Sequence, residues 1–194
     1  MSGPIDLGRV RSALAQAASR ELVQPRRAAV AVVLAPADDA FGSVSVLLVR
    51  RSEREGDPWS GHMALPGGHA QPEDADLLHT ARRETLEEVG IDLAGAELLG
   101  QLDDVSPMRS SDMVVRPFVF WAGAPYRITL SEEVAEVLWV PIDALASDAL
   151  RSTREVQVRG STLTVPAYVI DERVVWGMTY HLLERFLAQV LAFG

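Results

Sequence analysis

Three glutamates, Glu84, Glu87 and Glu88, stand close together in the segment ARRETLEEVG. Residues three and four apart are neighbours on a helix surface, so a helix would place all three on one side. Like charges at this spacing destabilise a helix by about 0.2–0.5 kcal/mol per pair. Solvent or a bound cation would offset that repulsion, and Mg²⁺ and Mn²⁺ favour carboxylate oxygens. The cluster therefore indicates either a solvated acidic face or a metal site.

The segment around these glutamates predicts a helix over residues 74–89. Asp74 or Asp76 can cap its N-terminus by accepting backbone N–H groups, and Gly90 suits the left-handed residue that follows a helix. One stripe of the helix should face the core, and it consists of Leu78, Ala81, Thr85 and Val89. Arg83 precedes Glu87 by four residues, so the two side chains can pair and fix the rotamer of the glutamate.

The remaining pattern predicts an α+β fold, in which helices cover a mixed sheet. Helical spacing of apolar residues predicts helices over 5–22 and about 178–192, and a short helix after Pro141. Residues 51–61 are polar and rich in glycine and proline, which predicts a loop. Runs rich in β-branched residues predict strands, with the first two forming a hairpin or neighbouring strands; they cover 28–34, 44–49, 96–101, 114–121, 135–140, 154–158 and 162–169.

The bulk composition predicts one domain over residues 1–194. The chain has 194 residues, of which 48% are hydrophobic, enough for one sizeable core. Its formal net charge of −9 provides no basic field for nucleic acid, so we expect no nucleic-acid partner. No apolar run reaches the roughly 18 residues of a membrane span, and we expect no membrane partner. The absence of cysteine excludes thiolate chemistry and fits a cytoplasmic location.

At the acidic segment the sequence resembles the Nudix hydrolase family. The family motif ends in Arg-Glu, an apolar residue, any residue, Glu-Glu, any residue, Gly and an apolar residue. Here Gly68 opens the motif and Arg83 to Ile91 closes it, so that it covers residues 68–91. Asp74 replaces the usual glutamate, and eight rather than seven residues separate it from Arg83. Thr85 occupies an apolar position of the motif.

The resemblance extends to the coenzyme A pyrophosphatase branch of this family. Members of that branch tend to have Pro-Gly-Gly before the motif, an aspartate in place of its glutamate, and Thr-Ala shortly before Arg-Glu. Residues 66–68, Asp74 and residues 80–81 match those features. The upstream loop GDPWSGH, with Trp59, is not typical of the branch.

The resemblance implies a Nudix-like α/β/α sandwich that hydrolyses a diphosphate with Mg²⁺ or Mn²⁺. Glu84, Glu87 and Glu88 would be the metal ligands, and Arg83 their structural partner. Gly67 and Gly68 would let the backbone approach the metal and phosphates closely. One of these glutamates, or a glutamate from a later loop, would orient or deprotonate the attacking water. Our candidate from the later loop is Glu133, for which the alternative is a residue of a solvated loop. A homodimer is common among relatives.

Residues of the loop before the motif could bind substrate. Arg50, Arg51 and Arg54 could hold phosphates in bidentate fashion, or pair with the acidic residues of the same loop. Trp59 could stack on a base or anchor the loop to the core.

The expected substrate is a small nucleotide-containing pyrophosphate, with coenzyme A or acyl-CoA favoured. ADP-ribose or another nucleoside diphosphate derivative is the alternative within the same chemistry. A third hypothesis is a non-catalytic nucleotide-binding module. The presence of all three motif glutamates argues against it.

Overall fold

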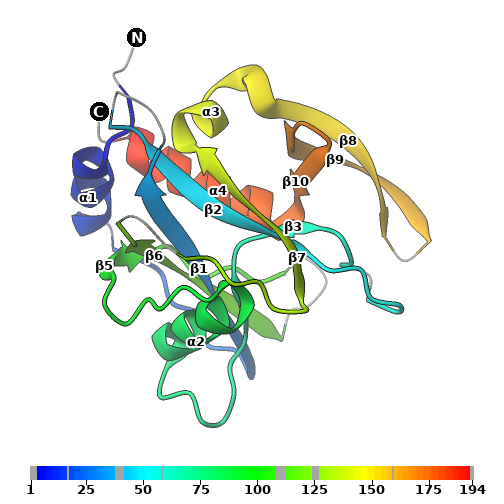
Figure 1. Ribbon diagram of the computed structural model, residues 1–194, viewed down its shortest axis with the longest axis horizontal. Coiled ribbons are helices and arrows are strands. Elements are labelled where there is room, and N and C mark those ends of the chain that lie inside the picture. The colour runs from blue at the N-terminus through cyan, green and yellow to red at the C-terminus, as the bar shows by residue number, and fades with distance from the viewer. Residues whose placement is uncertain are drawn as a thin grey trace.

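The structure is a computed structural model, and it describes residues 4–16, 18–37, 42–57, 59–107, 112–123, 127–158 and 160–192. Its main sheet has the order β3-β2-β1-β6-β5, and β4 pairs with β1 while β7 pairs with β2 (Figure 1). The strands of this sheet are β1 (Arg26–Pro36), β2 (Val44–Arg51), β3 (Met63–Ala64), β4 (Gly67–His69), β5 (Glu97–Gln101), β6 (Met113–Trp121) and β7 (Val134–Pro141).

The central strand β1 explains why the sheet is mixed. It runs parallel to β6, with Ala28 opposite Val115, and antiparallel to β2, with Leu34 opposite Val46. Every residue from Ala28 to Ala35 is buried. A strand covered on both faces reads as a continuous apolar run rather than an alternating one, and this run makes β1 the axis of the core.

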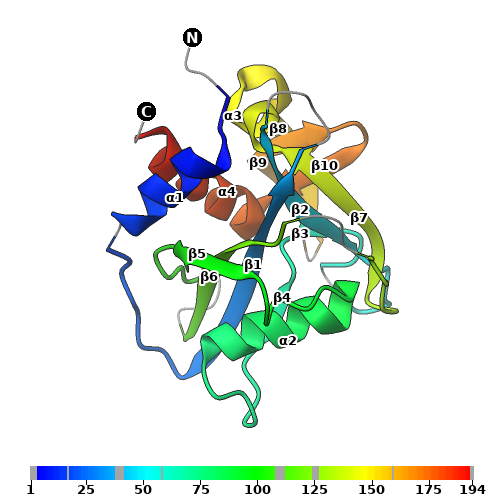
Figure 2. The same ribbon diagram turned by 60° about the vertical axis from the view of Figure 1, so that its left-hand side comes forward.

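Helices cover both faces of the main sheet (Figure 2). On one face, α1 (Leu7–Ala15), α3 (Ile142–Ala146) and α4 (Gly177–Leu191) pack in one apolar cluster with side chains such as Val32 and Val46. On the other face, α2 (Leu77–Val89) packs through Ala81 and Val89 against Ala31 and Phe118. The predicted α+β fold with a central mixed sheet is confirmed.

A second sheet has the order β10-β9-β8. Its strands are β8 (Arg151–Val158), β9 (Ser161–Ile170) and β10 (Arg173–Trp176), and a short 3-10 helix, η1 (Asp148–Leu150), precedes β8. Among the described residues, none of the helices is long and apolar enough to cross a membrane.

The seven predicted strands and the helices at 74–89 and 178–192 are present, with boundaries shifted by a few residues. The helix predicted over 5–22 is wrong beyond Ala15. Residues 18–22 have no regular secondary structure, and the backbone N–H groups of Arg20 and Leu22 donate to the side chains of Asp103 and Asp104 instead of to helix carbonyls. The sequence did not indicate β3, β4 or β10, which are short and gain their stability from tertiary pairing.

Candidate active site

Helix α2 carries the acidic residues on a rigid support. Asp76 caps its N-terminus by accepting the N–H of His79 at 2.7 Å, and Asp74 therefore does not serve as the cap. Gly90, at φ 73°, ends the helix in the left-handed conformation that favours glycine. Ala81, Thr85 and Val89 are fully buried, so the rotation of α2 about its axis is fixed by the core.

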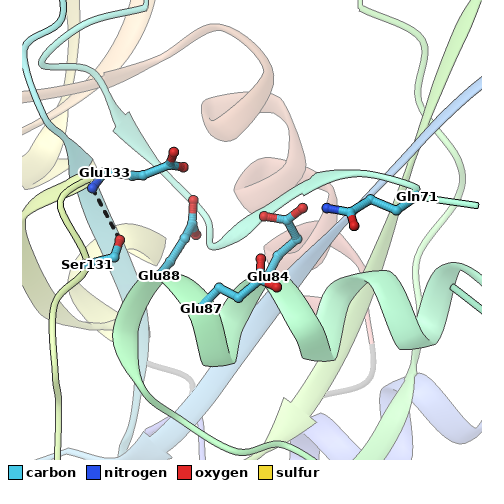
Figure 3. A pocket seen from close by; sticks show the side chains of 6 residues that line it. All are labelled: Gln71, Glu84, Glu87, Glu88, Ser131 and Glu133. Carbon is cyan, nitrogen blue, oxygen red and sulfur yellow. Dashed lines mark hydrogen bonds between the residues drawn. The ribbon is translucent and has the colours of Figure 1, made fainter. Parts of the chain in front are cut away.

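The three motif glutamates meet Glu133 around one cavity. The cavity has a volume of about 360 Å³ and is lined by Gln71, Glu84, Glu87, Glu88, Ser131 and Glu133. Figure 3 shows Glu84, Glu87 and Glu88 rising from α2 and Glu133 facing them from the segment before β7. Four carboxylates at one cavity create a strongly negative site.

Glu88 is the most deeply placed of these carboxylates, at 5% exposure. Its Oε2 accepts the backbone N–H of Gly67 at 3.1 Å. Burial raises the pKa of Glu88 to about 7, and the nearby charge of Glu84 adds to the effect, while the Gly67 N–H and the charge of Arg51 oppose it. Burying a carboxylate without a close cation disfavours its charged form. A cation bound next to Glu88 would therefore stabilise the charged carboxylate.

Arg83 holds the other two motif glutamates. Its Nη1 donates to Glu84 Oε1 at 2.9 Å and to Glu87 Oε2 at 3.0 Å, which is the pairing predicted from the spacing of Arg83 and Glu87. Burial raises the pKa of Glu84 in spite of this contact. Glu87 is more open, with 56% of its side chain exposed. One guanidinium thus orients two carboxylates beside the cavity.

Asp74 in turn fixes Arg83. Its Oδ1 and Oδ2 accept Arg83 Nε and Nη2 at 2.9 and 3.0 Å, and its Oδ2 also accepts the hydroxyl of Thr80. The Arg83 guanidinium, opposed by burial, holds the pKa of Asp74 well below its usual range. Asp74 therefore supports Arg83 and is not among the residues that line the cavity.

Gly67 and Gly68 bring the backbone of β4 against β1 and α2. A Cβ on Gly67 would overlap the Ala29 carbonyl oxygen and Val30 Cα, and its φ of 151° is accessible mainly to glycine. A Cβ on Gly68 would lie 2.5 Å from the carboxyl carbon of Glu84. Gly67 thus packs against β1 and Gly68 against the Glu84 carboxylate, while the expected approach of this backbone to a metal and phosphates stays a prediction.

Arg50 and Arg51, expected in the upstream loop, are the last residues of β2, and only Arg54 lies in the loop. Each of the three pairs with a carboxylate. Arg54 donates to Glu133 at 3.0 Å, which brings it to the rim of the cavity. Arg50 pairs with Glu136 on β7, and Arg51 pairs with Asp57. Arg51 thus pairs with an acidic residue of the loop, which was the alternative to holding a phosphate.

Trp59 lies outside the cavity lining. It packs near His62 and Trp176, with ring centroids 5.8 and 6.1 Å away, and remains 44% exposed. Both readings of Trp59 thus retain support, since one part of the ring anchors the loop and another part stays accessible.

Sequence reasoning missed two residues of the cavity, Gln71 and Ser131. Ser131 donates its N–H to the carbonyl of Glu88 at 3.0 Å and accepts the N–H of Glu133 through its hydroxyl. Its position two residues before Glu133 could have indicated this role. Gln71 has no comparable signal, because only the fold of the loop before α2 brings it to the cavity.

The donor set of the cavity fits a hard divalent cation. All candidate ligands are carboxylate oxygens, which suit Mg²⁺ and Mn²⁺, and the buried Glu88 lacks the cationic partner that Asp74 has. Within the described ranges, no three acidic or histidine side chains already converge as a complete metal-ligand cluster. The hydrogen bonds from Arg83 hold Glu84 and Glu87 in their present rotamers, so both side chains would have to turn toward an ion.

Fold and site together define an α+β domain with a glutamate-lined cavity beside α2. The sequence matches the NUDIX domain family over residues 25–159, and the chain belongs to the Nudix family. The glutamate-lined site and this membership make it a Nudix pyrophosphohydrolase, which acts on nucleotide-linked diphosphates.

Individual relatives support the same family. The human mitochondrial coenzyme A diphosphatase NUDT8 is 32% identical over 96% of this chain and 78% of its own length. An uncharacterised Schizosaccharomyces pombe protein is 48% identical over 41% of this chain, which spans only 29% of that protein. A MutT/nudix family protein of Enterococcus faecalis has the same fold, with a TM-score of 0.57, 18% identity, and coverage of 96% and 70% of the two chains.

Proposed function

We propose that this protein hydrolyses the diphosphate bond of coenzyme A or an acyl-coenzyme A, with Mg²⁺ or Mn²⁺ bound at Glu84, Glu87 and Glu88. The observation that carries the metal-dependent chemistry is that Glu88 is buried near the charge of Glu84, and that no ion pair of Glu88 occurs among the described residues. The choice of coenzyme A is supported by similarity to the human coenzyme A diphosphatase over nearly the whole chain.

The chain's own residues have distinct tasks in this reaction. A bound divalent ion supplies charge neutralisation at the diphosphate and lowers the pKa of a coordinated water. Glu84, Glu87 and Glu88 would hold the ion, and without it Arg83 holds the first two beside the cavity. Gly67 and Gly68, which carry no side chain, would let the backbone of β4 lie close to the ion and the phosphates.

Glu133 and Arg54 act from the opposite side of the cavity. The carboxylate of Glu133 faces the motif glutamates (Figure 3) and can accept a proton from the attacking water. Arg54 is paired with Glu133 and half exposed, so its guanidinium is available to a substrate phosphate at the rim. Arg50 and Arg51, which pair with Glu136 and Asp57, are less available.

ADP-ribose or a related nucleoside diphosphate compound is the second candidate substrate. The upstream loop GDPWSGH favours it, because this loop, with its 44% exposed Trp59, is not typical of the coenzyme A branch. A nucleotide-binding module without catalysis remains the least supported reading, since the carboxylates needed for hydrolysis line one cavity.

A substrate panel separates these candidates. The purified protein would be incubated with coenzyme A, acetyl-coenzyme A, ADP-ribose and a dinucleotide, each with Mg²⁺, Mn²⁺ or EDTA, and the products identified by mass spectrometry. We expect the coenzyme A compounds to be cut at the diphosphate only when metal is present. Cleavage of ADP-ribose with coenzyme A intact would favour the second candidate, and no cleavage of any compound would contradict the enzymatic proposal.

A further inference from the structure

Strand β8 forms an open edge of the second sheet. In the described part of the chain it pairs only with β9, in regular register from Arg151 opposite Tyr168 to Val158 opposite Ser161. Thr153, Arg154 and Glu155 are exposed, and β8 lies along the outer rim of the molecule (Figure 1). Such an edge presents a row of backbone donors and acceptors that can pair with another strand.

The edge of the main sheet at β5 is protected in ways that β8 is not. The β5–β6 pairing contains a register shift between Leu98 and Gly100, which disturbs the edge. Helix α1 packs near β5, and Arg11 pairs with Glu97 on that strand. Strand β8 contains no proline and its pairing has no register shift. The absence of these protective features leaves β8 competent to pair.

The register with β9 determines which backbone groups of β8 are free. Thr153 lies opposite Pro166. Because proline has no N–H to donate, this position fits a non-hydrogen-bonded pair, in which the backbone N–H and C=O groups of the two residues point away from each other. Backbone directions alternate along an antiparallel strand, so Ser152 and Arg154 bond toward β9. Arg151, Thr153 and Glu155 consequently direct their N–H and C=O groups outward.

We propose that β8 pairs with β8 of a second copy of this chain, antiparallel about a two-fold axis at Thr153. A two-fold axis between neighbouring antiparallel strands stands perpendicular to the sheet and keeps each residue on its own face. The axis must therefore pass beside one residue of β8, so that this residue lies opposite the same residue of the second copy. An axis at Arg154 would place arginine opposite arginine, and an axis at Glu155 would place glutamate opposite glutamate.

The axis at Thr153 gives complementary charges on both sides. Arg151 then faces the partner's Glu155, Glu155 faces the partner's Arg151, and the two Thr153 side chains meet at the centre. Opposite charges and threonine pairs directly across an antiparallel ladder are stabilising. Arg151 is already fixed in place by Glu184, at 3.0 Å, and by its position over the Tyr168 ring. The outcome is one continuous sheet across two copies.

Cysteine cross-linking tests this register directly, because the natural chain has no cysteine. In a hydrogen-bonded antiparallel pair the Cα atoms are about 5.5 Å apart, within the range of a disulfide. Thr153→Cys should therefore yield a covalent dimer on oxidation or with a short bis-maleimide. In the matched control Gln157→Cys, the two cysteines would be about 26 Å apart along the strands, and we expect no cross-link.

Proline substitution tests whether the ladder holds the dimer. Thr153→Pro removes an outward N–H at the centre of the proposed pairing, and Gln157→Pro removes one beyond it, so both should keep the β8–β9 ladder. Sedimentation velocity over a concentration series should show dimer loss in the first variant and a retained dimer in the second. Circular dichroism and pyrophosphohydrolase activity of both variants report separately on the fold and on the proposed function.

A charge reversal tests the side-chain pairing. Glu155→Lys places lysine opposite Arg151 of the partner and should weaken dimerisation at least tenfold, with recovery at high salt. Glu172→Lys makes the same charge change at the exposed turn between β9 and β10 and should leave the dimer intact. A wild-type protein that stays monomeric up to its solubility limit would overturn the proposal. So would equal cross-linking at positions 153 and 157, or a Thr153→Pro variant that dimerises as the wild type does.

Discussion

Asp74 lies before the N-terminal end of α2 and Glu88 lies in its last turn, and both carboxylates are nearly inaccessible to solvent. Asp74 accepts two hydrogen bonds from Arg83, together with others from His79, Thr80 and the backbone N–H of Gln71. Within the described part of the chain, Glu88 accepts a hydrogen bond from the backbone N–H of Gly67. The pKa of Asp74 is lowered by its arginine, and the pKa of Glu88 is raised to about 7 by burial.

Under the proposed function, this difference separates a structural carboxylate, just before α2, from a metal-binding carboxylate in the last turn of that helix. A buried charge is tolerated when a partner within the chain neutralises it, and it destabilises the fold when none does. The Asp74–Arg83 pair is complete without a ligand. Glu88 gains its compensation only when something from outside brings positive charge, which is why the two positions should respond in opposite ways to neutralisation.

The largest expected effect is on catalysis in Glu88→Gln. Replacing a metal ligand by an amide should lower kcat/KM by at least ~100-fold, because the charge that holds the ion is lost. The fold should remain intact, with an unfolding temperature in EDTA no lower than that of the wild type, since the substitution removes an uncompensated charge. Steady-state kinetics at saturating Mg²⁺ measure the first effect, and near wild-type rates would refute the assignment. Glu87→Gln should also abolish turnover.

Asp74→Asn should act on stability instead. Loss of the charged hydrogen bonds to Arg83 should lower the free energy of unfolding by about 2–3 kcal/mol. Denaturant unfolding with and without metal measures this change. Asp112→Asn is the matched control, because Asp112 is exposed and lies 3.9 Å from Arg26, and we expect a change within about 0.5 kcal/mol. A stable Asp74→Asn protein would remove the contrast with Glu88.

Gly68→Ala and Gly67→Ala sharpen the comparison at the edge of the cavity. The new Cβ at position 68 would meet the movable carboxylate of Glu84 and displace it, so we expect metal affinity to fall by roughly tenfold with little loss of stability. At position 67 the Cβ meets the backbone of β1, which cannot move aside, and the protein should lose stability. Calorimetric Mn²⁺ titration and thermal unfolding distinguish the two. Equal changes of Mn²⁺ affinity and of unfolding temperature in the two variants would contradict the different roles proposed for Gly67 and Gly68.

The smallest expected effect is a dependence of stability on pH. The raised pKa of Glu88 means that its contribution to stability is present in full below the ordinary glutamate pKa and is lost as pH rises through about 7. The lowered pKa of Asp74 has the opposite sign, since its contribution is present above the ordinary aspartate pKa and is lost only in strong acid.

Thermal unfolding between pH 5 and pH 8, run for the wild type and Glu88→Gln, isolates the contribution of Glu88. We expect the wild type in EDTA to lose about 1–3 kcal/mol over this range relative to the variant, and Mn²⁺ to cancel the loss. Parallel curves for the two proteins in EDTA would show that Glu88 does not titrate in this range.

The sequence by itself determined the elements and the identity of the motif glutamates. Apolar runs such as Ala28–Leu34 and the helical stripe of Ala81, Thr85 and Val89 express local periodicities, which depend only on spacing along one element. The same spacing placed Glu84, Glu87 and Glu88 on one side of α2 and predicted the Arg83–Glu87 pair. Extension of the first helix to residue 22 was wrong because the bonds from Arg20 and Leu22 to Asp103 and Asp104 join distant parts of the chain.

Only the tertiary structure decided what surrounds those glutamates. Asp74 could cap α2 by sequence, but the folded chain directs it to Arg83 and leaves the cap to Asp76. Gln71 and Glu133 reach the cavity because the loop before α2 and the segment before β7 converge in space. The burial that raises the pKa of Glu88 depends on atoms contributed by several elements. Local spacing determines which face a side chain occupies, and desolvation and charge compensation are set by packing between distant segments.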